Sequence, residues 1–148
     1  MPSARSARKH LSDAGYLENL TKKVFVSGFS WGPVEKKWPR FREVFYNFDP
    51  GMAADMPEPL IEHVSQDAGI IRNRVKIRAT VRNAQEVLRI AEEHGSFWNY
   101  VRSLDGLKYA ERSKVMAKRF ACVGPNTVYY FLRDCGEPVP SSKPEGVK

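Results

Sequence analysis

The sequence is poor in the residues that hold metals and form disulfides. It has only two cysteines, Cys122 and Cys135, and three scattered histidines. Neither cysteine has a second cysteine or a histidine at the spacing of a zinc site, so we expect no metal and no other cofactor. Two free thiols in a reducing compartment are a simpler expectation than a disulfide, which is typical of secreted proteins.

Long apolar runs are also missing. No stretch of about 18 apolar residues occurs, so we expect no segment to cross a bilayer. The basic N-terminus lacks the apolar centre and the cleavage site of a secretory signal. We therefore expect a protein of the cytosol, or of a bacterial nucleoid, with no membrane partner.

Positive charge is in excess. The 148 residues include 24 Lys and Arg against 17 Asp and Glu, which gives a formal net charge of +7 and a pI near 9.5. A basic protein favours a polyanionic partner, nucleic acid first and an anionic membrane second. The hydrophobic content of 42% is typical of a globular domain and argues against a disordered chain.

The hydrophobic pattern between the two ends of the chain is helical. Segments 1–13 and 137–148 are expected to be flexible tails, and residues 14–136 are expected to form one all-α domain, a compact bundle of about seven helices. The longest predicted helix covers residues 73–93, with an apolar stripe on one face and Gly95 just beyond its end. Shorter helices are predicted over residues 15–27, from Pro33 to Phe45, from Asp49, from Met56, after Phe97, over 107–118 and over 126–135.

A turn ending in Gly-Pro joins the last two predicted helices. A hairpin there places backbone N–H groups at the start of a helix, where the positive end of the helix dipole binds phosphate. Lys118 and Arg119 add positive charge beside it. Such a contact positions a protein on DNA without reading its sequence. The alternative is an ordinary connection between two helices, in which Gly124 only ends a helix.

Several segments together resemble the DNA-3-methyladenine glycosylase I family, in family order and at family spacing over about residues 17–136. The Gly-Ile-Ile-Arg-Asn-Arg stretch at residues 69–74 is the most specific of them. The segments are Gly28–Trp31, Phe48–Pro50, Gly69–Ile77, Phe120–Tyr130 and Cys135–Gly136, and likeness to a divergent branch of the family comes from Phe25–Trp31 and Glu35–Pro39.

The resemblance implies a helix-hairpin-helix fold that flips an alkylated purine out of double-stranded DNA into an aromatic pocket and hydrolyses its N-glycosidic bond. It implies that Trp31 stacks on the base and that Ser27 and Asn73 hydrogen-bond it. The DNA-binding residues that we expect are Lys118, Arg119, Phe120, Val123, Gly124, Asn126 and Thr127 in the hairpin, with Arg72, Arg74 and Lys76. We expect a monomer.

The sequence departs from the family at the residues that would carry charge in the pocket. Lys23 stands where the family has a glutamate, eight residues before the stacking tryptophan. On one continuous helix Lys23, Ser27 and Trp31 share a face, so Lys23 would repel a cationic base by roughly 4 kcal/mol at 4 Å and an effective dielectric of about 20. The alternative is that the helix turns slightly and Lys23 points into solvent.

Other departures concern the two ends of the chain. The zinc-binding cysteine and histidine of the family have no counterparts here, and no carboxylate follows the hairpin in a helix, so the chain is expected to be a C-terminally shortened member. Asp134 lies too early for the aspartate that related glycosylases place after the hairpin. Glu35 is a weak candidate for a substitute carboxylate. The catalytic residue stays open, and so does the alternative of an inactive, glycosylase-like DNA-binding protein.

Overall fold

The computed structural model describes residues 9–27 and 30–143. Over these residues the chain forms eight α-helices, one short 3-10 helix and no strand, which confirms the all-α prediction. The helices are α1 (Asp13–Val26), α2 (Trp31–Val44), the 3-10 helix η2 (Tyr46–Phe48), α3 (Pro50–Ala54), α4 (Glu58–Val64), α5 (Arg74–His94), α6 (Phe97–Ser103), α7 (Tyr109–Arg119) and α8 (Pro125–Asp134).

Local sequence signals set several helix boundaries. Asp49 caps α3, since its side chain accepts a hydrogen bond from the N–H of Met52, and Pro50 takes the first helical position. Gly95 follows α5 with a φ of 90°, a left-handed conformation that suits glycine. The longest helix therefore ends within a residue of its predicted end.

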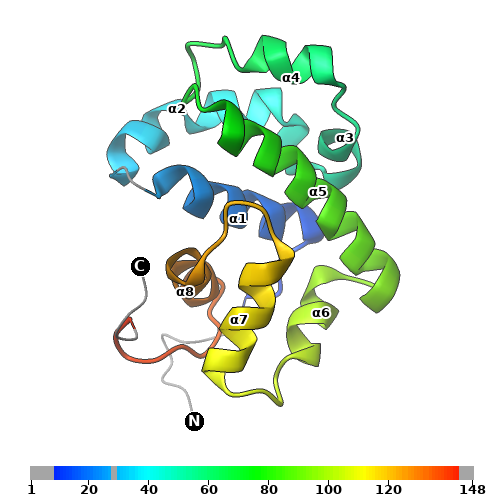
Figure 1. Ribbon diagram of the computed structural model, residues 1–148, viewed down its shortest axis with the longest axis vertical. Coiled ribbons are helices and arrows are strands. Elements are labelled where there is room, and N and C mark those ends of the chain that lie inside the picture. The colour runs from blue at the N-terminus through cyan, green and yellow to red at the C-terminus, as the bar shows by residue number, and fades with distance from the viewer. Residues whose placement is uncertain (1–8, 28–29, 144–148) are drawn as a thin grey trace.

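Helix α1 crosses the middle of the molecule (Figure 1). Helices α2, α3 and α4 lie on one side of it, α6, α7 and α8 lie on the other, and the long α5 runs past both groups. One continuous hydrophobic core joins the two sides, and α1 contributes Tyr16, Leu17, Leu20, Val24 and Phe25 to it. The position of α1 matters for function because its two faces are turned toward different sets of helices.

The segment after α8 packs on the domain where the structure describes it. Glu137 is only 3% exposed and forms an ion pair with Arg102 of α6. The hydroxyl of Tyr129 donates a hydrogen bond to the carbonyl of Pro140 at 3.0 Å. Residues 137–140 of the expected C-terminal tail thus lie against α6, α7 and α8. No helix in the described part of the chain is both long and apolar enough to cross a membrane.

Candidate functional site

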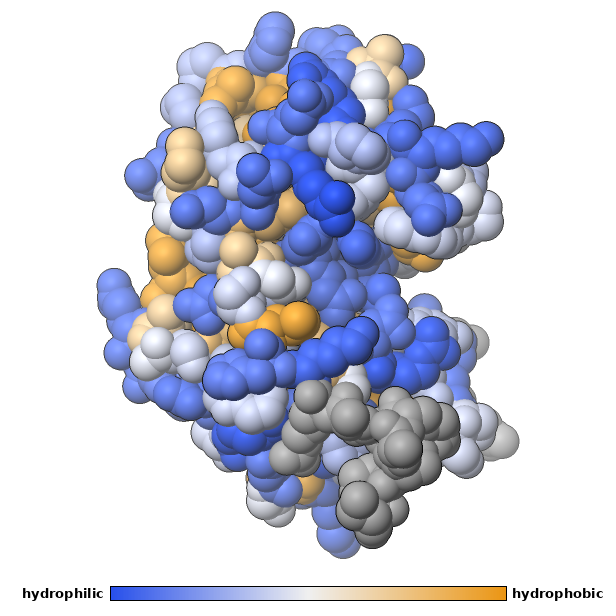
Figure 2. All heavy atoms as spheres, turned by 180° about the vertical axis from the view of Figure 1, so that it is seen from behind, coloured by the Kyte–Doolittle hydropathy of each residue, from blue (hydrophilic) through white to orange (hydrophobic). Residues whose placement is uncertain are grey.

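A cavity of about 670 Å³ opens between α1 and α8. Seen from behind, the outline of the molecule is indented on the side where α2 and α8 face each other, and mainly hydrophilic residues border the indentation (Figure 2). The volume lies within the range of about 300–1,000 Å³ that is usual for small-molecule sites. Its lining consists of Lys9, Leu11, Gly15, Glu18, Asn19, Lys22, Lys23, Val26, Trp31, Tyr130, Arg133 and Asp134.

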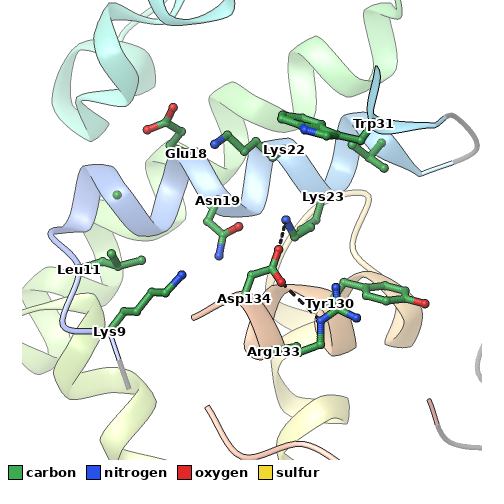
Figure 3. A pocket seen from close by; sticks show the side chains of 12 residues that line it. Lys9, Leu11, Glu18, Asn19, Lys22, Lys23, Trp31, Tyr130, Arg133 and Asp134 are labelled. Carbon is green, nitrogen blue, oxygen red and sulfur yellow. Dashed lines mark hydrogen bonds and ion pairs between the residues drawn. The ribbon is translucent and has the colours of Figure 1, made fainter. Parts of the chain in front are cut away.

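Two aromatic side chains stand in this pocket. Trp31 begins α2 and is 36% exposed, which is unusual for a tryptophan in a small domain. Its ring lies 6.1 Å from that of Trp38, which is buried and supports it from the core side. Tyr130 projects from α8 on the opposite wall (Figure 3). A flat ligand could therefore stack on Trp31 with a second aromatic ring facing it across the pocket.

Lys23 lines the pocket, although α1 ends at Val26 and does not run on to Trp31, and it is not a lone charge. Its ammonium nitrogen lies 2.5 Å from Oδ2 of Asp134, the last residue of α8 (Figure 3). The Asp134 side chain is 37% exposed and that of Lys23 is 17% exposed. The carboxylate offsets most of the field of Lys23 at longer range, so the repulsion of a cationic base that the sequence predicts is much reduced.

Glu18 is the second carboxylate of the pocket. Its Oε2 accepts hydrogen bonds from Nε1 of Trp38 and from Nε of Arg42, each at 2.7 Å. Burial alone would raise the pKa of Glu18, but these two hydrogen bonds outweigh it and hold the pKa below its ordinary value. Glu18 is therefore an ionised residue that is directed toward α2.

The remaining charged groups of the lining are cations. The ammonium of Lys22 lies 5.6 Å from the ring centroid of Trp31 and 5.6 Å from that of Trp38. Arg133 stands 4.8 Å from the Tyr130 ring, and Lys9 completes the set. The pocket thus combines aromatic rings with charges of both signs, and such a lining suits the binding of a polar, flat molecule.

Ser27 and Asn73, which were expected to hydrogen-bond the base, and the candidate carboxylate Glu35 lie outside the pocket lining. Helix α1 ends at Val26, so Ser27 leaves the helical stripe and its carbonyl accepts a hydrogen bond from Lys76 at 2.8 Å. Asn73 caps α5, with its side chain accepting from the N–H of Lys76 at 3.0 Å. Glu35 is exposed on α2. None of Ser27, Asn73 and Glu35 belongs to the lining of the pocket, while the neighbouring Gly28 and Phe29 lie outside the described residues.

The hairpin between α7 and α8 has a buried base and an open tip. Phe120 and Val123 are 6% and 8% exposed, and Thr127 is 7% exposed, so all three belong to the interior. A side chain added at Gly124 would meet nothing within 4 Å, which leaves the backbone open to an approaching ligand. Lys118 is exposed beside the turn, and Asn126 is half-buried in the first turn of α8.

Arg119, which was expected to bind DNA, is engaged by two carboxylates of the protein itself. Its guanidinium forms ion pairs with Glu86 and, at 2.7 Å, with Glu93, both on α5. Burial opposes the charge of Arg119, but the hydrogen bonds that it donates to these carboxylates hold its pKa above the ordinary value. Two partners satisfy its charge, so we leave Arg119 out of the proposed DNA interface.

Asn83 of α5 holds the hairpin in place. It is 2% exposed, its Nδ2 donates to the carbonyl of Ala121 at 3.1 Å, and its Oδ1 accepts from the N–H of Ala121 at 2.8 Å. This pair of bonds ties the turn to the longest helix. Cys122 follows with a φ of 59°, in the left-handed region that favours glycine.

The three basic residues expected near α5 have different surroundings. Arg72 and Arg74 are exposed, and Arg74 forms an ion pair with Glu62 at 2.9 Å. Lys76 is half-buried and reaches the end of α1 through its bond to Ser27, and burial lowers its pKa. Arg72 and Arg74 therefore lie at the surface, whereas Lys76 also helps to hold two helices together.

Sequence reasoning missed most of the charged lining. Glu18 and Lys22 stand four residues apart on one side of α1, and Asn19 and Lys23 stand four residues apart on the side toward α8 (Figure 3). That spacing is visible in the sequence, but the partner helix is not. Asp134 and Tyr130 reach the pocket only because the hairpin folds α8 back across α1. In the described residues, no group of three or more His, Cys, Asp and Glu side chains could hold a metal ion.

Comparison with known proteins gives a consistent result. The family model for methyladenine glycosylase matches residues 7–118. The DNA-3-methyladenine glycosylase 1 of Escherichia coli (strain K12) is 32% identical, over 86% of this chain and 82% of the relative. The DNA-3-methyladenine glycosylase of Haemophilus influenzae is 33% identical, over 74% of this chain and 70% of the relative.

Solved structures agree with these sequences. A crystal structure of 3-methyladenine DNA glycosylase I has a TM-score of 0.76 at 30% identity, covering 87% of this chain and 81% of that one. A variant of such an enzyme in complex with 3-methyladenine has a TM-score of 0.76 at 27% identity, covering 95% of this chain and 88% of that one. The likeness therefore extends to the last described helices.

Proposed function

The chain belongs to the methyladenine glycosylase family, and from that premise we propose that it excises alkylated purines such as 3-methyladenine from double-stranded DNA. The damaged base would turn out of the helix into the pocket between α1 and α8, and water would then cleave its N-glycosidic bond. We further propose that the protein acts as a monomer in the cytosol.

The observation that carries this proposal is the exposed Trp31 in a pocket whose volume is usual for small-molecule sites. An N3-alkylated adenine is cationic, and the electron pair of the breaking bond neutralises it as it leaves. Such a base needs no proton from the enzyme, so recognition rests on stacking and on cation–π attraction, each worth roughly 0.5–2 kcal/mol. Trp31 offers an aromatic face, and Tyr130 stands on the other wall.

The hairpin supplies a second element of the proposal. Gly124 leaves the start of α8 open, and the exposed Lys118 stands beside it. A phosphate bound there would fix one DNA strand close to α1 and α8 without reading its sequence. Arg72 would extend the contact from the start of α5.

Release of free base from methylated duplex DNA, measured by chromatography, tests the function. We expect the protein to release 3-methyladenine, and we expect Trp31→Ala to abolish release while binding to undamaged duplex survives. A protein that binds DNA but releases no base at any concentration would instead be the inactive, glycosylase-like DNA-binding protein. Release that is unchanged by Trp31→Ala would disprove the assignment of the pocket.

A further inference from the structure

We propose that Asp134 is the carboxylate that faces a cationic base in this pocket, and that Lys23 positions it. This inference rests on the proposed function, because it concerns how the same pocket recognises its substrate. The carboxylate that contacts the base would then come from α8, and not from the position on α1 where the family has a glutamate and this chain has Lys23. The match to the family model ends at residue 118, so Asp134 lies outside it.

Few carboxylates are placed where they could face a cationic base. The lining of the pocket includes two, Glu18 and Asp134. Glu18 is directed toward α2 and is held by Trp38 and Arg42 through one oxygen, on the side of α1 away from α8 (Figure 3). Glu35 is exposed and lies outside the lining. This leaves Asp134 as the carboxylate that faces the pocket between the two helices.

Asp134 has the capacity to accept another hydrogen bond. Its Oδ2 contacts Lys23 at 2.5 Å, whereas its Oδ1 lies 3.5 Å from Nε of Arg133, at the outer limit of a hydrogen bond. A carboxylate has about four lone-pair positions, so one Lys23 contact leaves several open. With 37% of its side chain exposed, Asp134 can accept from the amino group of a purine while Lys23 stays in place.

The position of Asp134 in its helix adds to the negative potential at the carboxylate. Asp134 ends α8, where the carbonyl groups of the last turn carry partial negative charge. An aspartate at that end is disfavoured by the helix dipole, and Lys23 offsets the cost. A cation placed beside Asp134 meets the carboxylate and the helix end together. Asp134 therefore faces the base, and Lys23 holds the carboxylate in its orientation.

Single-turnover release of 3-methyladenine from methylated duplex tests the roles of the two residues. We expect Asp134→Asn, which keeps the shape and removes the charge, to slow release by about tenfold or more. We expect Lys23→Met to slow it less, because the carboxylate remains. The exchange of both residues, Lys23→Asp with Asp134→Lys, should recover most of the rate, because a carboxylate again faces the pocket. Release by Asp134→Asn at the wild-type rate would overturn the proposal.

A purely structural bridge between α1 and α8 predicts a different pattern, so binding is measured as well. The probes are 3,9-dimethyladeninium, a permanent cation, and neutral 9-methyladenine. We expect the wild type to prefer the cation and Asp134→Asn to lose that preference by about tenfold. If Asp134→Asn keeps the wild-type preference for the cation and only lowers the free energy of unfolding, the Lys23–Asp134 ion pair has a structural role alone. If the wild type releases no base, the proposed function fails, whereas this binding preference still decides the role of Asp134.

Discussion

Glu18 accepts hydrogen bonds from Trp38 and Arg42 through the same carboxylate oxygen. Burial works against the charged form, yet the two donors keep the pKa of Glu18 below its ordinary value. A carboxylate whose pKa is lower in the folded than in the unfolded state stabilises the fold above its unfolded pKa. That contribution is lost as the pH falls through the folded pKa.

Glu18→Gln tests this linkage. At pH 7 we expect the variant to lower the free energy of unfolding by about 1 kcal/mol, because the acceptor loses its negative charge and the ion pair with Arg42 is lost. The difference from the wild type should shrink below about pH 4.5, where the unfolded carboxyl is protonated. Urea unfolding at a series of pH values measures it. A difference that stays constant into strong acid would mean that the ionised state of Glu18 does not contribute.

Single residues also show what local sequence does not reveal. Lys23 lies on the pocket side of α1, but α1 ends at Val26, so the single helix that would align Lys23 with Trp31 does not form. Its pairing with Asp134 was not predictable, because the two residues are far apart in sequence and meet only through the fold. Arg119 was predicted from the sequence to bind DNA. In the structure its charge is instead paired with Glu86 and Glu93 of α5, which the sequence did not predict.

Among the elements of the fold, the hairpin depends on α5 for its position. Asn83 is buried and makes both of its hydrogen bonds to the backbone of Ala121. Without these bonds the turn that presents Gly124 and Lys118 would lose its anchor. The link makes Asn83 a positioning residue for the proposed phosphate contact.

Asn83→Ala should lower the free energy of unfolding by about 1–3 kcal/mol, because it leaves the backbone groups of Ala121 without their partner. It should also weaken binding to duplex DNA. Gln85→Ala is the matched control, since Gln85 donates a single bond from the same helix to the carbonyl of Ala54, away from the hairpin. Equal loss of DNA affinity in both variants, measured by fluorescence anisotropy, would count against the anchoring role.

Helix type and position were predictable because the signals are local. Caps such as Asp49, the glycine after α5 and the 3.6-residue apolar period all act within a few residues. The sequence did not predict that α1 ends at Val26 or that Tyr46, Asn47 and Phe48 have positive φ values. None of these residues is glycine, so the local sequence gives little sign of this left-handed conformation.

Over the whole molecule, the charge of +7 should appear in the response of DNA binding to salt. Each phosphate contact releases counterions, so the affinity for duplex DNA falls as salt rises, with a slope of about −0.9 per contact. Lys118→Ala should reduce this slope by about one, whereas Arg119→Ala should leave it unchanged because Arg119 is engaged by Glu86 and Glu93. Equal effects of the two substitutions would contradict the proposed interface.

The central claim is that the damaged base occupies the pocket between α1 and α8 and stacks on Trp31. Titration with free 3-methyladenine, followed by backbone amide NMR shifts, tests it most directly. We expect saturable shifts along α1 and α8, and we expect Trp31→Ala to weaken binding by about tenfold or more. Trp98→Ala, which removes a tryptophan outside the pocket lining, should bind as the wild type does. Undiminished binding by Trp31→Ala, or shifts confined to another surface, would contradict the account.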